Sequence, residues 1–417
     1  MSHFTRQNEV LCCEDLSLDD IAAAHGTPTY VYSAASIDAA FEAYQAALTG
    51  QSHLICYAVK ANSNLAILNR LARLGAGFDV VSAGELERVL HAGGDAGKIV
   101  FSGVGKSRAE LALALDKGIR CFNVESESEL KQLADVAGAL RKTAPVSIRI
   151  NPDVDAGTHP YISTGLRENK FGVDASTARR LYRLARDTDA LNPIGLDCHI
   201  GSQIMDVSPF LEAMDFLINM IHDLSAEGIE ISHLDIGGGL GVSYEKSAPR
   251  IGDYIAALLD RLLPLDVELV LEPGRSIVAM AGVLLTKVEY LKSTSLRHFA
   301  IVDAAMNDLL RPALYGAWQE ICPVTPRTGD ALEWDIVGPV CETADFLGKA
   351  RPLVLAEGDL LAVMGAGAYG YSMSSNYNSR PRAAEVLVDG ASAHLIGKRE
   401  SLEALWQRES IPPGWSR

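Results

Sequence analysis

Short apolar runs rich in β-branched residues alternate with amphipathic stretches up to about residue 276. The runs have the length of buried strands, and the stretches between them repeat apolar residues at helical spacing. Strands are predicted at residues 54–60, 78–82, 99–103, 121–125, 146–151, 194–200, 233–238 and 268–273. Helices are predicted at Ala83–His91, Lys106–Lys117, Glu127–Leu140, Thr177–Thr188, Val207–Glu227 and Gly252–Leu263. Eight alternating units predict a parallel, closed (β/α)8 barrel of the TIM type.

An open doubly wound sheet is the alternative architecture. In that fold a glycine-rich motif opens the first nucleotide-binding unit. Here the glycine run, Gly237–Gly239, comes late and begins no such unit. The closed barrel is therefore preferred.

The pattern changes after about residue 276, where Ile277–Leu291 forms a long β-rich run with no helix after it. Further β-like runs follow at His298–Asp303, Leu332–Val340, Leu360–Ala366 and Ala384–Val388. They predict a mostly antiparallel β domain. We expect residues 1–26 to join this domain, residues 27–276 to form the barrel, and residues 277–417 to form the C-terminal β domain.

Composition narrows the function classes. The chain has 417 residues, which favours two domains, and 22% charged residues, which is typical of a globular protein. A net charge of −16 argues against nucleic acid or an anionic membrane as partner. No apolar run reaches the ~18 residues that span a bilayer, and the polar start has no signal-peptide core. Seven cysteines without a CxxC predict neither a disulfide framework nor a metal site, so the cytoplasm is the expected compartment.

Lys60 ends the first predicted strand, at the edge where barrel enzymes place their chemistry. A lysine among apolar neighbours is a candidate for a Schiff base with an aldehyde cofactor, although a solvated lysine at a strand end is the simpler alternative. Asp79 and Ser82 lie on the second strand, and His199 and Ser202 follow the sixth. A lone histidine is more often a satisfied core residue than a functional one.

The last two strands end in Gly237–Gly239 and in Glu272-Pro273-Gly274-Arg275. The glycines alone indicate only a tight turn, but with Ser202 and Arg275 they predict a bed of N–H groups for a phosphate. Glu272 on an apolar strand is costly to bury unless it is paired. Beside a lysine-bound cofactor, it suggests the carboxylate that keeps a pyridine nitrogen protonated.

Three stretches of the second domain also carry polar chemistry, and each is individually compatible with a structural role. They are Arg311–Gly316, Gly338–Asp345 and the glycine-rich Gly365–Gly370. Their arginine suits a carboxylate, their glutamate suits an ammonium group, and their cysteine suits a proton donor.

Together these motifs resemble the fold-type III pyridoxal-phosphate decarboxylases, and within that family the branch that acts on diaminopimelate. The resemblance extends from about residue 26 to 400. It is carried by Ala58–Asn62, His199–Gln203, Gly237–Gly239, Glu272–Arg275, Asn151–Asp155, Thr158-His159, Asn169–Gly172, Arg311–Ala317, Gly338–Asp345 and Ser374–Arg382. Small departures are Thr343-Ala344, where the family often has Ser-Gly, and Trp318, where it often has histidine.

The resemblance implies a role for each matched residue. Pyridoxal 5'-phosphate would be held by Lys60, Asp79, His199, Ser202, Gly237, Gly238, Gly239, Glu272, Gly274, Arg275 and Tyr369. The non-reacting end of the substrate would be held by Arg275, Arg311, Tyr315, Glu342 and Tyr369. Lys60, His199, Glu272 and Cys341 would be catalytic. Cys341 and Glu342 would come from the partner of a homodimer, and residues 152–172 would form an active-site loop.

The implied reaction is decarboxylation of meso-2,6-diaminopimelate to L-lysine and CO₂, the last step of lysine biosynthesis. Loss of CO₂ leaves a carbanion that needs a strong electron sink, which a protonated pyridine opposite Glu272 provides. Two arginines and a glutamate suit the distal end of diaminopimelate better than that of ornithine. Alternatives are a relative acting on carboxynorspermidine, ornithine or arginine, a catalytically silent relative, and a barrel enzyme with another cofactor.

Overall fold

The computed structural model describes residues 3–155, 170–262 and 265–415. The chain forms two compact units, of which one is Asp38–Ile277 and the other combines Met1–Ile37 with Val278–Arg417. The sequence analysis placed the domain boundaries after residues 26 and 276, whereas the structure divides the chain after Ile37 and Ile277.

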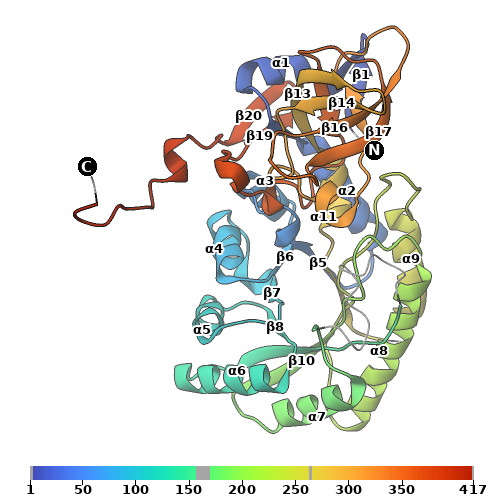
Figure 1. Ribbon diagram of the computed structural model, residues 1–417. Coiled ribbons are helices and arrows are strands. Elements are labelled where there is room, and N and C mark those ends of the chain that lie inside the picture. Colours follow the sequence, from blue (N-terminus) through green and yellow to red (C-terminus); the bar gives the residue numbers. More distant parts are fainter. Residues whose placement is uncertain (1–2, 156–169, 263–264, 416–417) are drawn as a thin grey trace. The chain divides into compact units, whose positions relative to one another are not determined.

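The first unit is a closed barrel of parallel strands (Figure 1). Its strands are β5 (His53–Ala58), β6 (Gly77–Val80), β7 (Ile99–Phe101), β8 (Cys121–Val124), β9 (Ala144–Arg149), β10 (Leu191–Asp197), β11 (His233–Asp235) and β12 (Glu268–Leu271). Their order around the barrel is β10-β11-β12-β5-β6-β7-β8-β9. The predicted (β/α)8 fold is therefore confirmed, with strand ends that differ from the prediction by a few residues.

Helices alternate with these strands and surround them (Figure 1). They are α3 (Leu65–Arg73), α4 (Ala83–His91), α5 (Arg108–Lys117), α6 (Glu127–Leu140), α7 (Ala175–Arg186), α8 (Ser208–Ala226) and α9 (Ile251–Leu262). Several begin at a side chain that accepts a backbone N–H, and Ser107 forms a full capping box with Glu110. These caps fix where the corresponding βα loops turn into helices.

The barrel interior changes from apolar to polar along the strand direction. Leu54, Cys56, Val100, Cys121 and Val270 form one buried apolar cluster. Two residues after three of them, on the same strand face, the chain places buried polar side chains. These are Ser102 after Val100, Asn123 after Cys121 and Glu272 after Val270. The polar end is the carboxyl-terminal end of the strands, where barrel enzymes carry their sites.

The second unit is built on a nine-stranded, mostly antiparallel sheet, which confirms the predicted β domain. Its strands are β4 (Thr29–Ser33), β13 (Gly282–Ser293), β14 (His298–Val302), β15 (Ile321–Pro323), β16 (Leu332–Val337), β17 (Phe346–Leu353), β18 (Leu360–Val363), β19 (Ala384–Asp389) and β20 (Ser392–Gly397). The prediction of a β run from Ile277 was wrong at its start. Residues 275–281 form α10 (Arg275–Val278) and a 3-10 turn, so β13 begins only at Gly282, where the helical turn ends.

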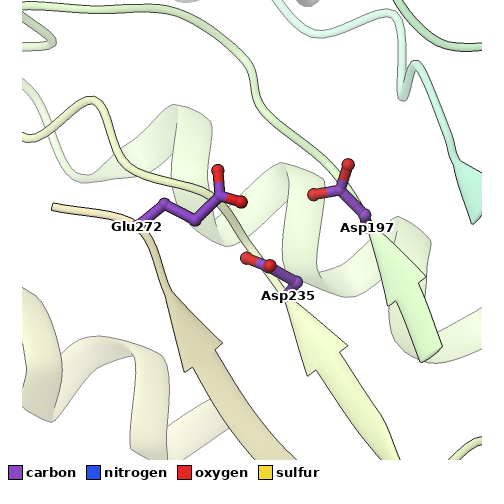
Figure 2. Close-up of side chains that lie close together, drawn as sticks. All are labelled: Asp197, Asp235 and Glu272. Carbon is purple, nitrogen blue, oxygen red and sulfur yellow. The ribbon is translucent and has the colours of Figure 1, made fainter. Parts of the chain in front are cut away.

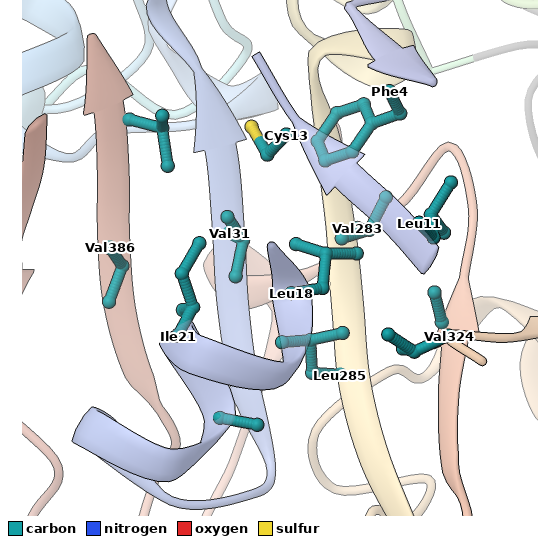
Figure 3. Close-up of a cluster of buried hydrophobic side chains, with 13 residues drawn as sticks. Phe4, Leu11, Cys13, Leu18, Ile21, Val31, Val283, Leu285, Val324 and Val386 are labelled. Atoms are coloured by element: carbon teal, nitrogen blue, oxygen red, sulfur yellow. The ribbon is translucent and has the colours of Figure 1, made fainter. Parts of the chain in front are cut away.

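The N-terminal residues pack onto this sheet. They form a small sheet of β1 (Phe4–Gln7), β2 (Val10–Cys13) and β3 (Leu16–Ser17), followed by α1 (Leu18–His25). Figure 3 shows their apolar side chains against those of the sheet strands. The shared core contains Phe4, Leu11, Cys13, Leu18, Ile21, Val31, Val283, Leu285, Val324 and Val386. Within the described ranges, no helix has the length and apolar character needed to span a bilayer.

Candidate active site

Five neighbouring strands of the barrel, β10-β11-β12-β5-β6, carry the polar residues singled out in the sequence. Because parallel strands end at the same edge, His199, Gly237–Gly239, Glu272, Lys60 and Asp79 are brought to one mouth of the barrel. Residues up to 212 positions apart in sequence, such as Lys60 and Glu272, are therefore neighbours only because the barrel closes between β12 and β5.

Lys60 lies in a 3-10 turn, Val59–Ala61, directly after β5. Its neighbours Val59 and Ala61 are buried, whereas the Lys60 side chain is 36% exposed. The Nζ atom donates to Oδ2 of Asp79, which lies on β6 and is fully buried. The other Asp79 oxygen, Oδ1, has no hydrogen-bond partner among the described residues. Asp79 thus holds the partly exposed amine at the barrel mouth.

His199 follows β10, and its ring is fixed by the glycine run. The Gly238 N–H donates to Nδ1 at 3.1 Å, which leaves that nitrogen as an acceptor. Burial, and then the charges of Arg149 and Lys60, lower the pKa of His199 well below its usual range. A neutral ring is therefore presented at the mouth. A Cβ at Gly237 would lie 2.6 Å from the same Nδ1, so only glycine fits beneath this ring.

The glycine run itself lets two backbone segments approach closely. A Cβ at Gly238 would lie 2.1 Å from the Glu272 carbonyl oxygen, and one at Gly239 would lie 2.3 Å from that of Gly201. Gly237 and Gly239 both have positive φ, of 68° and 103°. Backbone in this conformation exposes N–H groups and suits an anion.

Arg275 joins the segments that follow β10 and β12. Its Nη2 donates to Ser202 Oγ at 3.0 Å and its Nη1 to Tyr244 Oη at 3.3 Å. Gly274 precedes it, and a Cβ there would lie 3.0 Å from the Cβ atoms of both Ala58 and Ala61. The arginine and the serine hydroxyl therefore lie beside the turn that carries Lys60.

Glu272 is buried and is surrounded by neutral donors. Its Oε1 accepts long hydrogen bonds from Ser102 Oγ at 3.4 Å and Asn123 Nδ2 at 3.5 Å. Asn123 also donates to Ser102 Oγ at 3.1 Å. Burial, together with nearby carboxylates, raises the pKa of Glu272 well above its usual range. The group is poised to gain or lose a proton in response to a nearby charge.

Two further carboxyl groups lie next to Glu272 (Figure 2). One oxygen from each of Asp197, Asp235 and Glu272 lies within 4.8 Å of the others, and all three residues are buried. Burial, and then Asp235, raise the pKa of Asp197; burial also raises the pKa of Asp235 to about 7. This spacing alone would suit a cation, but Arg149 Nε already lies 3.9 Å from Asp197 Oδ2. We therefore describe these residues as a carboxyl cluster and not as a metal site.

The sequence analysis did not select Asp197, Asp235, Asn123 or Arg149 as site residues. Each is a buried polar side chain near the carboxyl-terminal end of a barrel strand, and its polar identity at that position could be read from the sequence. Arg149 also contacts the end of the stretch compared with an active-site loop. Its guanidinium lies 4.9 Å from the centroid of the Phe171 ring, and Glu125 accepts from both Arg149 and the Gly172 N–H. Residues 156–169 of that stretch, including Thr158, His159 and Asn169, lie outside the described residues.

In the second unit, Arg311 and Tyr315 occupy the first and last positions of the short helix α11 (Arg311–Tyr315). A spacing of four residues places both on one side of the helix. Arg311 is buried and Gly316, with a φ of 60°, ends the helix. Trp318 packs on Arg351, whose guanidinium lies 4.6 Å from the ring centroid, so the departure at Trp318 has a structural role.

Cys341 and Glu342 lie in a loop that Asp345 holds in shape. Asp345 accepts from the backbone N–H groups of Met306 and Val340, each at 2.7 Å. Cys341 is the one exposed cysteine of the seven, all of which lie in the described part of the chain. Glu342 is exposed as well. Both side chains are therefore accessible at the surface of this unit.

Tyr369 lies in the glycine-rich loop 365–370 and has a φ of 54°. The loop packs closely on its own unit, since a Cβ at Gly367 would lie 1.9 Å from the Val278 carbonyl oxygen. Gln319 donates to the carbonyl oxygens of Met364 and Gly365 at 3.0 and 3.1 Å. These contacts fix the loop and hold the half-buried tyrosine in place.

Comparisons with known proteins agree with the geometry. The family model described as "Pyridoxal-dependent decarboxylase, pyridoxal binding domain" matches residues 34–279. The diaminopimelate decarboxylase of Vibrio cholerae is 59% identical over 99% of this chain and its own full length. The enzyme of the same name from Pseudomonas aeruginosa is 58% identical over 99% of this chain and its own full length.

Solved structures are similar over nearly the whole chain as well. The crystal structure of Helicobacter pylori diaminopimelate decarboxylase complexed with L-lysine has a TM-score of 0.91 at 46% identity, and covers 94% of this chain and 98% of its own. The enzyme from M. jannaschii has a TM-score of 0.94 at 39% identity, with 99% and 98% covered.

Proposed function

This chain belongs to the diaminopimelate decarboxylases, within the pyridoxal-dependent decarboxylase family, and we propose from its geometry how its residues carry out the family's reaction. The chain uses pyridoxal 5'-phosphate to remove CO₂ from meso-2,6-diaminopimelate, and it releases L-lysine. This is the last step of lysine biosynthesis.

The residues at the barrel mouth fit the cofactor group by group. Lys60 offers an amine to the aldehyde, and Glu272 offers a carboxylate to the ring nitrogen. The backbone of Gly237–Gly239, which lacks room for any Cβ, offers N–H groups to the phosphate. Ser202 and Arg275 add a hydroxyl and a cation, with Gly274 and Tyr369 assigned to the same phosphate. The observation that carries the proposal is the presence of these groups on adjacent strands, β10-β11-β12-β5-β6.

The chain's own residues prepare the reaction. When bound, pyridoxal phosphate supplies a protonated ring that accepts the electron pair left by CO₂. Glu272 is assigned to holding the ring-nitrogen proton and His199, as a neutral ring, to covering the cofactor face. Asp79 holds Lys60 at the mouth through its buried carboxylate. Beside Asp79, the Nζ atom of Lys60 would also hold or move a proton during the reaction.

The second unit is assigned to the substrate. Arg311, Tyr315, Glu342 and Tyr369, with Arg275 from the barrel, are proposed to hold the distal ammonium and carboxylate groups. Cys341 is proposed as the acid that protonates the carbon from which CO₂ departs. Because Cys341 and Glu342 are exposed on their own unit, we assign them to the active site of a partner subunit in a homodimer. We also propose a cytoplasmic location.

CO₂ release tests the function directly. The purified protein with added pyridoxal phosphate should release CO₂ from meso-diaminopimelate and form lysine stoichiometrically. Ornithine and arginine, run beside it, should give less than about 1% of that rate, because they lack the distal carboxylate that charge-assisted hydrogen bonds would hold. L,L-diaminopimelate should also react at less than about 1% of that rate, because it carries the same groups with the opposite configuration at one carbon. Faster turnover of ornithine or arginine would overturn the assignment of the distal clamp.

The shared site has its own test. Mixing inactive Lys60→Ala protein with inactive Cys341→Ala protein should restore up to about one quarter of the parent activity, because mixed dimers would contain one intact site. Each variant alone should remain inactive. No recovery after verified subunit exchange would contradict the assignment of Cys341 to the partner's site.

A further inference from the structure

The carboxyl cluster of Asp197, Asp235 and Glu272 contains more acidic groups than the proposed pairing with the cofactor needs. Asp235 lies at the end of β11, between the ends of the strands that carry the other two. Figure 2 shows its carboxyl group between those of Glu272 and Asp197. All three groups are buried, with residue exposures of 1%, 0% and 6%. Three carboxylates this close in a dry interior cannot all remain charged.

The positive charge near the cluster is unevenly distributed. Arg149 Nε lies 3.9 Å from Asp197 Oδ2, and its Nη1 also donates to Glu125 at 3.3 Å. Glu272 receives the donors Ser102 and Asn123 and, under the proposed function, the cofactor ring. Asp235 has no cation within ion-pair distance among the described residues. Of the three groups, Asp235 is therefore the one whose charge is balanced neither by a protein cation nor, under the proposed function, by the cofactor ring.

The two oxygens of Asp235 have different surroundings. Oδ1 accepts the Gly237 N–H at 2.8 Å, which ties the carboxyl group to the start of the glycine run. Oδ2 is buried and has no hydrogen-bond partner among the described residues. Asp197 Oδ1, a second buried oxygen without such a partner, belongs to the same cluster. A hydrogen on Asp235 Oδ2 would turn an unpaired acceptor into a donor that faces carboxylate acceptors.

We propose that Asp235 is a positioning residue that stays protonated in the working enzyme, with its acid hydrogen on Oδ2 donated to a neighbouring carboxylate. It thereby leaves Glu272 as the charged partner of the cofactor ring and links that partner to the glycine run through Gly237. The proposal rests on the proposed function for the role of Glu272. The arrangement adds a hydrogen bond and removes a like-charge repulsion in one step.

The groups that face Asp235 support this assignment. The barrel strands bring to it the carboxyl groups of Asp79, Asp197 and Glu272, the guanidinium of Arg149, and the thiols of Cys56, Cys121 and Cys198. Three of these groups are acids that resist a further negative charge, and one is a cation already shared by two carboxylates. Burial acts in the same direction, since it is the largest cause that raises the pKa of Asp235.

Infrared spectroscopy of the full chain with bound cofactor tests the protonated state without any substitution. A carbonyl-stretch band of a buried carboxylic acid should be present at pH 7, should shift in D₂O, and should be lost in Asp235→Asn. If no such band is present, or if it persists unchanged in Asp235→Asn, the proposal is overturned. This readout is valid whether or not the protein turns over diaminopimelate, so it separates the proposal from the proposed function.

Stability as a function of pH gives a second readout. The folded pKa of Asp235 lies above its unfolded value, so the folded protein binds the extra proton and loses stability as pH rises from about 4 through about 7. Asp235→Asn lacks this dependence of stability on pH. Its Tm relative to the parent should therefore rise by about 3 °C or more between pH 5 and pH 8.

Asp197→Asn is the matched contrast and should lower the Tm at pH 8, because Arg149 loses a charged partner. A pH-independent difference for Asp235→Asn would contradict the proposal.

Enzyme kinetics distinguish a role of Asp235 as a hydrogen-bond donor from a role in packing alone. Asp235→Leu, which removes the donor, should lower kcat about 10-fold to 100-fold with little change in KM. The conservative Asp235→Asn, which keeps an N–H donor, should recover part of that loss and move the alkaline limb of the pH profile upward. Equal losses in both variants would overturn the donor role. Added Mg²⁺ or Ca²⁺ that raised the Tm of the parent but not of Asp235→Asn would instead indicate a cation site and would also overturn the proposal.

Discussion

The two ends of the barrel interior are made by the same strands yet have opposite chemistry. At the amino-terminal end, Val100, Cys121 and Val270 belong to one apolar cluster. Two residues further along the same strands lie Ser102, Asn123 and Glu272, which form a polar network. Along one face of each strand, the earlier residue therefore stabilises the barrel and the residue two positions later belongs to the polar end.

This difference shows that apolar packing at one end of the barrel offsets the unfavourable burial of polar groups at the other end. Apolar burial contributes about 25 cal/mol per Å² at one end, whereas buried carboxyl groups at the other end are unfavourable unless they are paired or protonated. Within the described residues, several buried oxygens of the polar end have no hydrogen-bond partner, among them one each of Asp79, Asn123, Asp197 and Asp235. The apolar end stabilises a framework that tolerates this arrangement.

Lys60→Ala, at the polar end of the barrel, should have the largest effect of the variants considered. It removes the only amine assigned to bond the cofactor, so activity should fall by at least about 10³-fold and the visible absorbance of the bound cofactor should be lost. Thermal stability without cofactor should also fall, because the buried Asp79 carboxylate loses the amine that donates to it. Steady-state kinetics, absorbance and thermal unfolding measure the three effects.

Lys98→Ala is the control from the opposite end. Lys98 precedes β7, and its Nζ donates to the Gly75 carbonyl oxygen at 3.2 Å. This variant should retain the parent's kcat within about two-fold, since surface changes away from such sites are usually small. If Lys60→Ala kept the cofactor absorbance of the parent, the assignment of the whole mouth would be wrong.

The repeating pattern made the framework predictable from sequence. Every predicted barrel strand overlaps an observed one, and Ala83–His91 and Glu127–Leu140 have the bounds of α4 and α6. Lys60 and Glu272 follow β5 and β12, at the strand ends where the sequence pattern of one polar residue after an apolar run predicted them. Local pattern was sufficient in these cases.

The carboxyl cluster could not be derived in the same way. Asp197, Asp235 and Glu272 are separated by long helical segments, and Asp197 and Asp235 look like ordinary strand-end acids. Their proximity follows from the order of strands in a closed barrel and from the two-residue periodicity that turns all three inward. The β run expected from Ile277 failed for a related reason, because α10 is determined by the chain's tertiary surroundings and not by residue propensity.

A tight pair at the amino-terminal end of β11 sharpens the comparison. Gly195 on β10 is in register with His233 on β11, and a Cβ at Gly195 would lie 2.0 Å from His233 Nε2. Gly195→Ala should lower the free energy of unfolding by about 3 kcal/mol, the upper end of the range for overpacking. In a His233→Ala background the same change should cost less than about 1 kcal/mol. Urea unfolding of the four proteins measures this coupling, and equal costs in both backgrounds would show that the ring does not require the glycine.

His233 also provides a smaller, pH-dependent test at this level of the barrel. The side chain is buried, and neither ring nitrogen has a hydrogen-bond partner among the described residues. Burial, and then the charge of Arg120, lower the pKa of His233 from 6.5 to about 3. Between about pH 6.5 and pH 3, His233 therefore binds a proton in the unfolded chain but not in the folded chain. The free energy of unfolding falls as the pH falls through this range. Between pH 7 and pH 5 the free energy of unfolding of the parent should fall by about 2 kcal/mol more than that of His233→Ala.

The carboxyl cluster contributes the opposite pH dependence over part of this range, so the two proteins must be compared at each pH and not the parent alone. Parallel curves for the two proteins would show that the ring is protonated or solvated in the folded state, and would contradict the dry, apolar character of the amino-terminal end of the barrel.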